Sequence, residues 1–211
     1  LKGGHSGIQI VCQRANANKL LFRFLNTRPE LSLCSVDGGG LRNAIPREAE
    51  AVVLVEAARY DELVAALKAY EQVVRAEFAG IEEGISSEVA RCERPAQMLP
   101  AELAVKLTKC VVACPDGVQR MSTAMPGLVQ TSSNLARVVS DGSSVKLQSL
   151  LRSSVNSEKE ALGEAFEALF TLAGAEGELS GSYNGWDPNM ESPLLKAMTA
   201  SYEQLYGKRP A

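Results

Sequence analysis

Residues 129–151, Val-Gln-Thr-Ser-Ser-Asn-Leu-Ala-Arg-Val-Val-Ser-Asp-Gly-Ser-Ser-Val-Lys-Leu-Gln-Ser-Leu-Leu, decide the fold class of this chain. Two largely apolar runs, Val129–Val139 and Val145–Leu151, flank the dipeptide Asp141-Gly142. Asp-Gly between two such runs is a strong signal for a β-hairpin. Because a hairpin pairs its two strands in opposite directions, this stretch predicts an antiparallel sheet.

The rest of the chain alternates between helical and strand-like patterns. Apolar residues recurring at three- and four-residue steps predict helices over 16–25, 61–79, 157–173 and 192–206, with a weaker helix over 103–114. Further strands are expected at 31–36, 50–55 and 177–183. The expected end signals are N-caps at Asn16, Asp61 and Ser192, a capping box from Ser157 to Glu160, and stops at Gly174 and Gly207.

These elements predict an α+β fold. Hairpin-paired strands separated by helices favour a mostly antiparallel sheet with helices packed on one face. The order helix–strand–strand–helix recurs about twice, so a tandem of two related units is an open alternative. The polar stretch Glu82–Arg94, followed by Pro95 and Pro100, is the expected internal boundary, near residues 82–100.

Composition narrows the classes of partner. The chain has 211 residues, a net charge of −3, 45% hydrophobic residues and 22% charged residues, which is typical of a globular protein. A sequence pI near 5.4 argues against nucleic acid as a partner, because nucleic-acid binders usually show a basic face. A run of 18 consecutive apolar residues is missing, so no membrane-spanning helix is expected.

The cysteines and the single histidine limit the chemistry. Five widely spaced cysteines do not form a secreted disulfide framework, so we expect reduced thiols and a cytoplasmic location. Cys110 and Cys114 are four residues apart, but a structural zinc site needs four ligands, so we interpret both as small buried side chains. His5 is the only histidine, and a cysteine hydrolase using it as base is a remote alternative, because no cysteine has a convincing base beside it.

Four residues are candidates for a functional site. His5 lies between glycines in Gly3-Gly4-His5-Ser6-Gly7, which would present its imidazole on an exposed turn. Asn43 precedes Ala-Ile-Pro, and Arg152 ends the second strand of the hairpin, where its guanidinium could bind a carboxylate. Asn134 lies on the partner strand. A surface histidine, an ordinary turn and an exposed strand-end arginine remain the simpler alternatives.

Several motifs together resemble one enzyme family. They are Leu-Lys-Gly-Gly-His-Ser-Gly at 1–7, Asn-Ala-Asn-Lys-Leu-Leu at 16–21, Leu-Arg-Asn-Ala-Ile-Pro-Arg-Glu-Ala at 41–49, Thr-Ser-Ser-Asn at 131–134, Leu-Arg-Ser at 151–153, Gly-Trp-Asp-Pro at 185–188 and Tyr-Glu-Gln-Leu-Tyr-Gly-Lys at 202–208. In order and over nearly the whole chain, they are similar to bacterial aminoacyl-histidine dipeptidase, or Xaa-His dipeptidase, of the zinc aminoacylase and carboxypeptidase superfamily.

The resemblance implies a piece of a longer enzyme. Residues 1–185 resemble its ferredoxin-like lid or dimerisation domain, and residues 186–211 resemble a helix that returns to the catalytic domain. Two zinc ions, with ligands outside this chain, would be the parent's cofactors. The implied partners are a dipeptide substrate, the missing catalytic domain and a second copy in a homodimer. The fragment alone would then be inactive.

The resemblance also assigns roles to the four candidates. His5 matches the lid histidine that polarises the scissile carbonyl and stabilises the oxyanion, and Arg152 matches the arginine that pairs with the substrate carboxylate. Asn43 and Asn134 match substrate contacts. Relatives often have a histidine where this chain has Val11, which bears on substrate preference. The alternative from another class is a self-contained α+β ligand-binding or regulatory module with Arg152 in a closed pocket.

Overall fold

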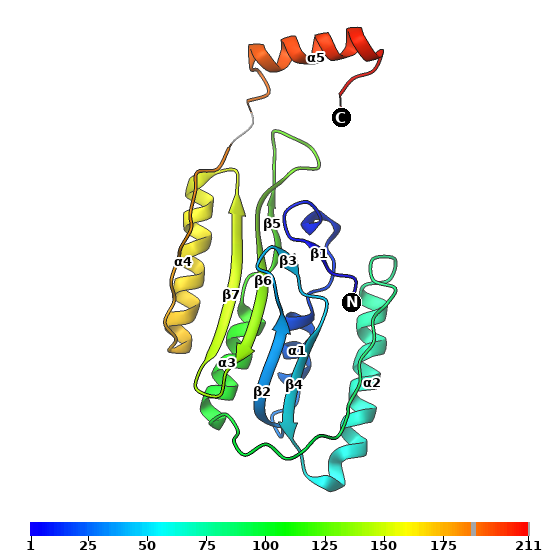
Figure 1. The fold of residues 1–211 in the computed structure, drawn as a ribbon, viewed down its shortest axis with the longest axis vertical. Helices are drawn as coiled ribbons and strands as arrows, with labels where there is room; N and C mark the ends of the chain where they lie inside the picture. Colours follow the sequence, from blue (N-terminus) through cyan, green and yellow to red (C-terminus); the bar gives the residue numbers. More distant parts are fainter. Residues whose placement is uncertain (187–188, 211) are drawn as a thin grey trace.

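The computed structural model describes residues 1–186 and 189–210, with one main sheet and five α-helices (Figure 1). The strands are β1 (Gly4–His5), β2 (Ser32–Gly39), β3 (Ala44–Ile45), β4 (Ala49–Leu54), β5 (Gly117–Met121), β6 (Val129–Ser140) and β7 (Val145–Ser153). The α-helices are α1 (Ala17–Leu25), α2 (Tyr60–Glu77), α3 (Ala101–Ala113), α4 (Asn156–Ala173) and α5 (Pro193–Tyr206). Short 3-10 helices cover Ile10–Cys12 and Ala57–Arg59.

The main sheet joins two hairpins side by side. β2 pairs with β4, β6 pairs with β7, and the two hairpins meet where Asp37–Gly39 of β2 pairs with Arg137–Val139 of β6. β5 pairs with the earlier half of β6, from Val129 to Ser133, and every pairing is antiparallel. The predicted α+β class with a mainly antiparallel sheet is therefore confirmed, and β1 and β3 form a separate two-stranded sheet.

The hairpin turn between β6 and β7 forms as its sequence predicts. Gly142 has a φ of 88°, and the carboxylate of Asp141 accepts hydrogen bonds from the amides of Ser144 at 2.8 Å and Ser143 at 3.1 Å. These bonds, with those from the two serine hydroxyls, hold the pKa of Asp141 below its usual value. The turn thus fixes the register of the longest strand pair.

Three helices cover one face of the main sheet. Figure 1 shows α1 and α3 behind the strands and α4 beside β7. Side chains of these three helices form one core with the inner face of the sheet. The buried core consists of Phe22, Leu33, Val36, Leu107, Val111, Cys114, Leu135, Val138, Leu162 and Phe166. Residues 82–100 have no helix or strand, and the core draws side chains from both sides of that segment.

Helix α2 lies outside this layer and packs against α1. The Tyr70 hydroxyl donates to the Leu20 carbonyl at 2.9 Å, and its ring centroid is 5.4 Å from that of Phe24. Burial raises the pKa of Tyr70 to about 12. An Arg23–Glu77 pair with a 2.6 Å contact links the two helices at the surface.

Most helix ends follow the predicted signals. The Asn16 side chain accepts from the amides of Asn18 and Lys19, Ser192 caps α5, and α4 and α5 stop at Gly174 and Gly207 in the left-handed region. Two expectations were wrong. Helix α2 begins one residue before Asp61 without a side-chain cap. Helix α4 begins at Asn156, so Ser157 lies inside the helix and forms no capping box.

The strand expected at 177–183 was also wrong. This segment has no sheet partner among the described residues and runs as an extended stretch along α4 (Figure 1). The Leu179 side chain packs where Gly163 has none, since a methyl group on Gly163 would lie 2.9 Å from Leu179 Cδ1. The Lys159 ammonium donates to the Tyr183 carbonyl. The segment therefore satisfies its packing on a helix instead of a strand.

Candidate functional site

The small sheet formed by β1 and β3 brings two of the four candidates together. His5 pairs with Ala44 in this sheet, and the Ser6 amide donates to the Asn43 carbonyl at 2.9 Å. Gly3 permits the close approach, because its φ is 64° and an added methyl group would lie 3.0 Å from the Ile45 carbonyl oxygen. His5 and Asn43, both exposed, are thus held on neighbouring turns.

Asn134 supports the Asn43 turn from the main sheet. Its side chain is 1% exposed, and its Nδ2 donates to the carbonyls of Arg42 at 3.1 Å and Ala44 at 2.8 Å. These are the two carbonyls on either side of Asn43. The amide group of Asn134 therefore binds the backbone of the turn that carries Asn43.

Arg152 meets His5 beside Gly7. A methyl group placed on Gly7 would lie 3.1 Å from His5 Cε1, 3.3 Å from His5 Nδ1 and 3.4 Å from Arg152 Cζ. The imidazole and the guanidinium therefore flank the same small space, which a side chain on residue 7 would fill. Residues far apart in the sequence, one in β1 and one in β7, converge here.

The backbone orients the His5 ring. Its Nδ1 accepts hydrogen bonds from the amides of Gly7 at 3.1 Å and Ile8 at 3.2 Å. The Gln9 side chain adds support, because its Oε1 accepts from the His5 amide at 2.8 Å. In a neutral imidazole one nitrogen donates and the other accepts, so the ring hydrogen of His5 is on Nε2. Nε2 is the donor that the ring offers to a ligand.

Arg152 and Asn134 lie on the same face of the sheet. Arg152 is opposite Ser132, and Asn134 is opposite Leu150, which is two residues before Arg152. This face is the one away from α1, α3 and α4, and the two-stranded sheet lies over part of it (Figure 1). The site is therefore an open surface with an exposed histidine and a half-buried arginine.

Three buried polar atoms at this site have no hydrogen-bond partner among the described residues. They are Ser6 Oγ, Asn134 Oδ1 and Arg152 Nε. Buried polar groups in folded proteins are nearly always paired with protein, water or ligand. We interpret these three groups, which lie close to His5, as available to a polar ligand or to water.

A polar network holds the end of β7 from the helix side. Thr131 Oγ1 contacts Ser153 Oγ at 2.9 Å and donates to the carboxylate of Glu158 at 2.5 Å. Gln130 donates to Glu158 at 2.8 Å and Arg120 pairs with it at 2.8 Å. Hydrogen bonds from Thr131 and then Gln130 lower the pKa of Glu158. Sequence reasoning missed Glu158 and Gln9, because neither belongs to a motif and both act through hydrogen bonds that form only in the folded chain.

Neither the Cys110–Cys114 pair nor the described acidic residues form a second site. Cys110 and Cys114 are buried as expected, and burial raises the pKa of the Cys114 thiol to about 12 and also raises that of Cys110. A nucleophilic cysteine needs a lowered pKa, so neither is suited to that role. Within residues 1–186 and 189–210, His, Cys, Asp and Glu side chains form no group of three or more that could hold a metal ion.

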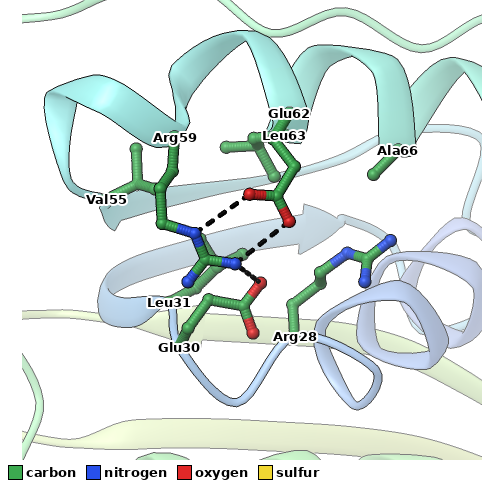
Figure 2. A pocket seen from close by; sticks show the side chains of 8 residues that line it. All are labelled: Arg28, Glu30, Leu31, Val55, Arg59, Glu62, Leu63 and Ala66. Atoms are coloured by element: carbon green, nitrogen blue, oxygen red, sulfur yellow. Dashed lines mark hydrogen bonds and ion pairs between the residues drawn. The ribbon is translucent and has the colours of Figure 1, made fainter.

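Two hollows lie near α2. Figure 2 shows the smaller, where Arg59 binds Glu62 at 3.0 Å and Glu30 at 3.4 Å, and Arg28 lies nearby. With a volume of about 10 Å³ it has room for no more than a water molecule. The larger is a groove of about 1170 Å³ between α1, β4, α2 and residues 85–95, lined by apolar side chains such as Leu20, Leu67 and Val74. In the part of the chain that the structure describes, no helix has the length and apolar character needed to cross a bilayer.

Comparisons with known proteins agree with the motifs. Residues 1–82 match the family model of the peptidase dimerisation domain, of the M20 type. The chain is 36% identical over 213 residues to the cytosol non-specific dipeptidase of Escherichia coli (strain K12). The aligned region covers 100% of this chain and 44% of that protein. The chain also matches the crystal structure of aminoacylhistidine dipeptidase from Vibrio alginolyticus, with a TM-score of 0.96, 36% identity, and coverage of 100% and 44% of the two chains. The chain therefore spans less than half the length of these relatives.

Proposed function

Because this chain carries an M20 peptidase dimerisation domain and is homologous over its whole length to M20 dipeptidases, we propose that it is the substrate-binding lid of a metallodipeptidase. The observation that carries the proposal is the convergence of the His5 imidazole and the Arg152 guanidinium at Gly7. The two groups offer one hydrogen-bond donor and one fixed positive charge on an open surface. Such a surface suits a small anionic peptide held between this domain and another.

In this proposal His5 stabilises the oxyanion. Its Nε2–H is the free donor of the ring, and the Gly7 and Ile8 amides hold the ring in place before substrate arrives. A donor oriented in advance toward developing negative charge needs no reorganisation during the reaction, which is why such donors contribute strongly to rate. His5 therefore donates a hydrogen bond to the oxygen of the reacting carbonyl and transfers no proton.

Arg152 binds the substrate's terminal carboxylate in the same proposal. Its buried Nε lacks a partner among the described residues, so the guanidinium retains a donor for an anionic ligand. Charge-assisted bonds from arginine to a carboxylate are short and directional. Asn43, exposed beside His5, contacts the substrate. Asn134, assigned by resemblance as a substrate contact, contributes by holding the Asn43 turn and by its unpaired Oδ1.

The family implies zinc for the parent enzyme, and the described side chains of this chain do not form a ligand set for it. We place the zinc ligands in the part of the parent outside this chain. Zinc there would supply the activated water of a hydrolase. The contribution of this chain is then binding and orientation of the dipeptide.

We also propose how the domain is arranged in the parent. Residues 1–185 form the ferredoxin-like lid, and residues 186–211, including α5, return to the catalytic domain. The parent forms a homodimer, and the second copy docks along the groove between β4 and α2. Two observations support this: residues 1–82, which match the dimerisation model, provide most of the groove lining, and β4 pairs with β2 alone among the described strands. An unpaired strand edge is a ready docking surface. A cytoplasmic location fits the name of the Escherichia coli relative.

The test measures kcat and KM of the full-length parent enzyme with two substrates, a dipeptide and the same dipeptide with a C-terminal amide. We expect His5→Ala to lower kcat on β-alanyl-histidine by about 100- to 1000-fold with little change in KM. We expect Arg152→Ala to raise KM by about 10- to 100-fold for the dipeptide only, because the amide lacks the carboxylate. An equal rise in KM for acid and amide in Arg152→Ala would contradict the assignment of Arg152 to the substrate carboxylate. Wild-type kcat in His5→Ala would contradict the assignment of His5 to the oxyanion.

The alternative function is a self-contained ligand-binding module. It predicts that the 211-residue chain binds a dipeptide tightly by itself. The lid proposal predicts that this chain, given zinc, does not hydrolyse β-alanyl-histidine and binds it weakly, because the other wall of the site is in another domain. The exposure of His5 favours the lid.

A further inference from the structure

The segment that follows α4 returns to the end of the sheet where Arg152 lies. After Gly174, residues 175–185 run back along α4 as an extended segment (Figure 1). Leu179 packs at Gly163, and the Lys159 ammonium lies 6.0 Å from the centre of the Tyr183 ring. The segment is thus attached along the helix and arrives at the turn between β7 and α4.

Gly185 is pressed against this turn. Its amide donates to the Asn156 side-chain oxygen at 2.7 Å. A methyl group on Gly185 would lie 2.4 Å from the Ser154 carbonyl oxygen and 2.7 Å from that of Ser153. Both distances are shorter than real Cβ contacts, and both involve backbone atoms that cannot rotate away. Only glycine fits at residue 185 without moving the backbone that directly follows Arg152.

The same backbone is held from other sides. Ser153 Oγ contacts Thr131 Oγ1 at 2.9 Å and accepts from the Val155 amide at 3.1 Å. The Ser154 amide donates to the Gln130 carbonyl at 3.0 Å. These bonds leave the backbone of Ser153 and Ser154 little freedom to adjust locally. A steric clash with their carbonyl oxygens would therefore displace the preceding residue, Arg152.

We propose that Gly185 and Asn156 are positioning residues for Arg152. The segment by which the chain leaves the sheet domain then sets the location of the guanidinium that binds the substrate carboxylate. This inference rests on the proposed function of Arg152 and adds residues that touch neither substrate nor His5. It also couples the carboxylate end of the site to the path of the chain after residue 185.

The test introduces Gly185→Ala into the full-length parent, with Gly84→Ala as matched control. Gly84 has nothing within 4 Å of the added methyl group. Since an error of 1 Å in substrate positioning can cost about 100-fold, we expect Gly185→Ala to raise KM for the dipeptide by about tenfold. The KM for the dipeptide amide should stay within about twofold of wild type, as should both values for Gly84→Ala. Asn156→Ala, which removes the side-chain hydrogen bonds with Gly185 and Asn184 without a clash, should act in the same direction more weakly.

A double variant separates this role from a general structural one. If Gly185 acts through Arg152, Gly185→Ala adds nothing to the effect of Arg152→Ala. An equal rise in KM for acid and amide, or a full extra tenfold rise in the Arg152→Ala background, would overturn the inference. If Gly185→Ala does not fold, the Asn156→Ala comparison decides in the same way. Should Arg152→Ala itself not distinguish acid from amide, the proposed function fails, and this inference fails with it.

Discussion

Replacing Asn134 with leucine tests whether this buried amide holds the turn of the candidate site. The two side chains have the same branched shape and the same number of heavy atoms, so the change removes hydrogen bonds without opening a cavity. Asn134 donates at 3.1 Å and 2.8 Å to the carbonyls of Arg42 and Ala44. At a net value of about 1 kcal/mol for each bond, Asn134→Leu should lower the free energy of unfolding by about 2 kcal/mol.

The assay is urea denaturation of the 211-residue chain, followed by circular dichroism, together with hydrogen exchange at the Ser6 amide. That amide donates to the Asn43 carbonyl, so it reports whether the turn is still formed. Asn43→Ala is the control, because this exposed side chain makes no hydrogen bond with the described residues; its effect should stay within about 0.5 kcal/mol. A loss below about 0.5 kcal/mol for Asn134→Leu, with unchanged protection of Ser6, would refute the reasoning.

Two further predictions concern the frame of the domain. Gly38→Ala should destabilise the chain by about 2 kcal/mol in urea denaturation, because the added methyl group would lie 2.0 Å from Asn18 Oδ1 and 2.7 Å from Ala49 Cβ. Gly40→Ala, with open space around it, is the control, and equal stability of the two variants would contradict the packing argument. Tyr70 should make unfolding easier at high pH: its pKa is raised to about 12 in the folded chain, above about 10 when unfolded, so its stabilisation is complete below pH 10 and is lost as the pH rises through 12. Between pH 10 and 12, the free energy of unfolding of Tyr70→Phe should therefore fall less than that of wild type. Equal falls for the two proteins over this range would rule this out.

Features that depend on neighbouring residues in sequence could be predicted well. The Asp141-Gly142 hairpin, the Asn16 cap and the glycine stops at Gly174 and Gly207 all form as expected, because each signal acts over a few residues. The strand expected at 177–183 failed since its partner is helix α4, which no local pattern identifies. Strand β5 was not expected, because it is five residues long and gains its definition from pairing with β6.

In the candidate site, too, contacts between distant parts of the chain could not be predicted. His5, Asn43 and Arg152 could be named from their motifs, yet their convergence depends on pairings of only two residues in β1 and β3. The support given by Gln9, Glu158 and Gly185 could not be predicted. Glu158 and Gly185 act through contacts with segments distant in the sequence, and Gln9 acts through one bond to the His5 amide. Contacts of these kinds leave no periodic trace in the sequence.

The two backbone hydrogen bonds to the His5 ring decide which chemical groups of a ligand could bind the imidazole. With the amide hydrogens of Gly7 and Ile8 occupying one ring nitrogen, a molecule that brings a further donor to the imidazole finds no lone pair there. Amine or amidine groups aimed at this ring should gain little. Phosphinates or boronates, which carry an anionic oxygen, could accept a hydrogen bond from Nε2. A carboxylate on the same ligand could then bind the Arg152 guanidinium.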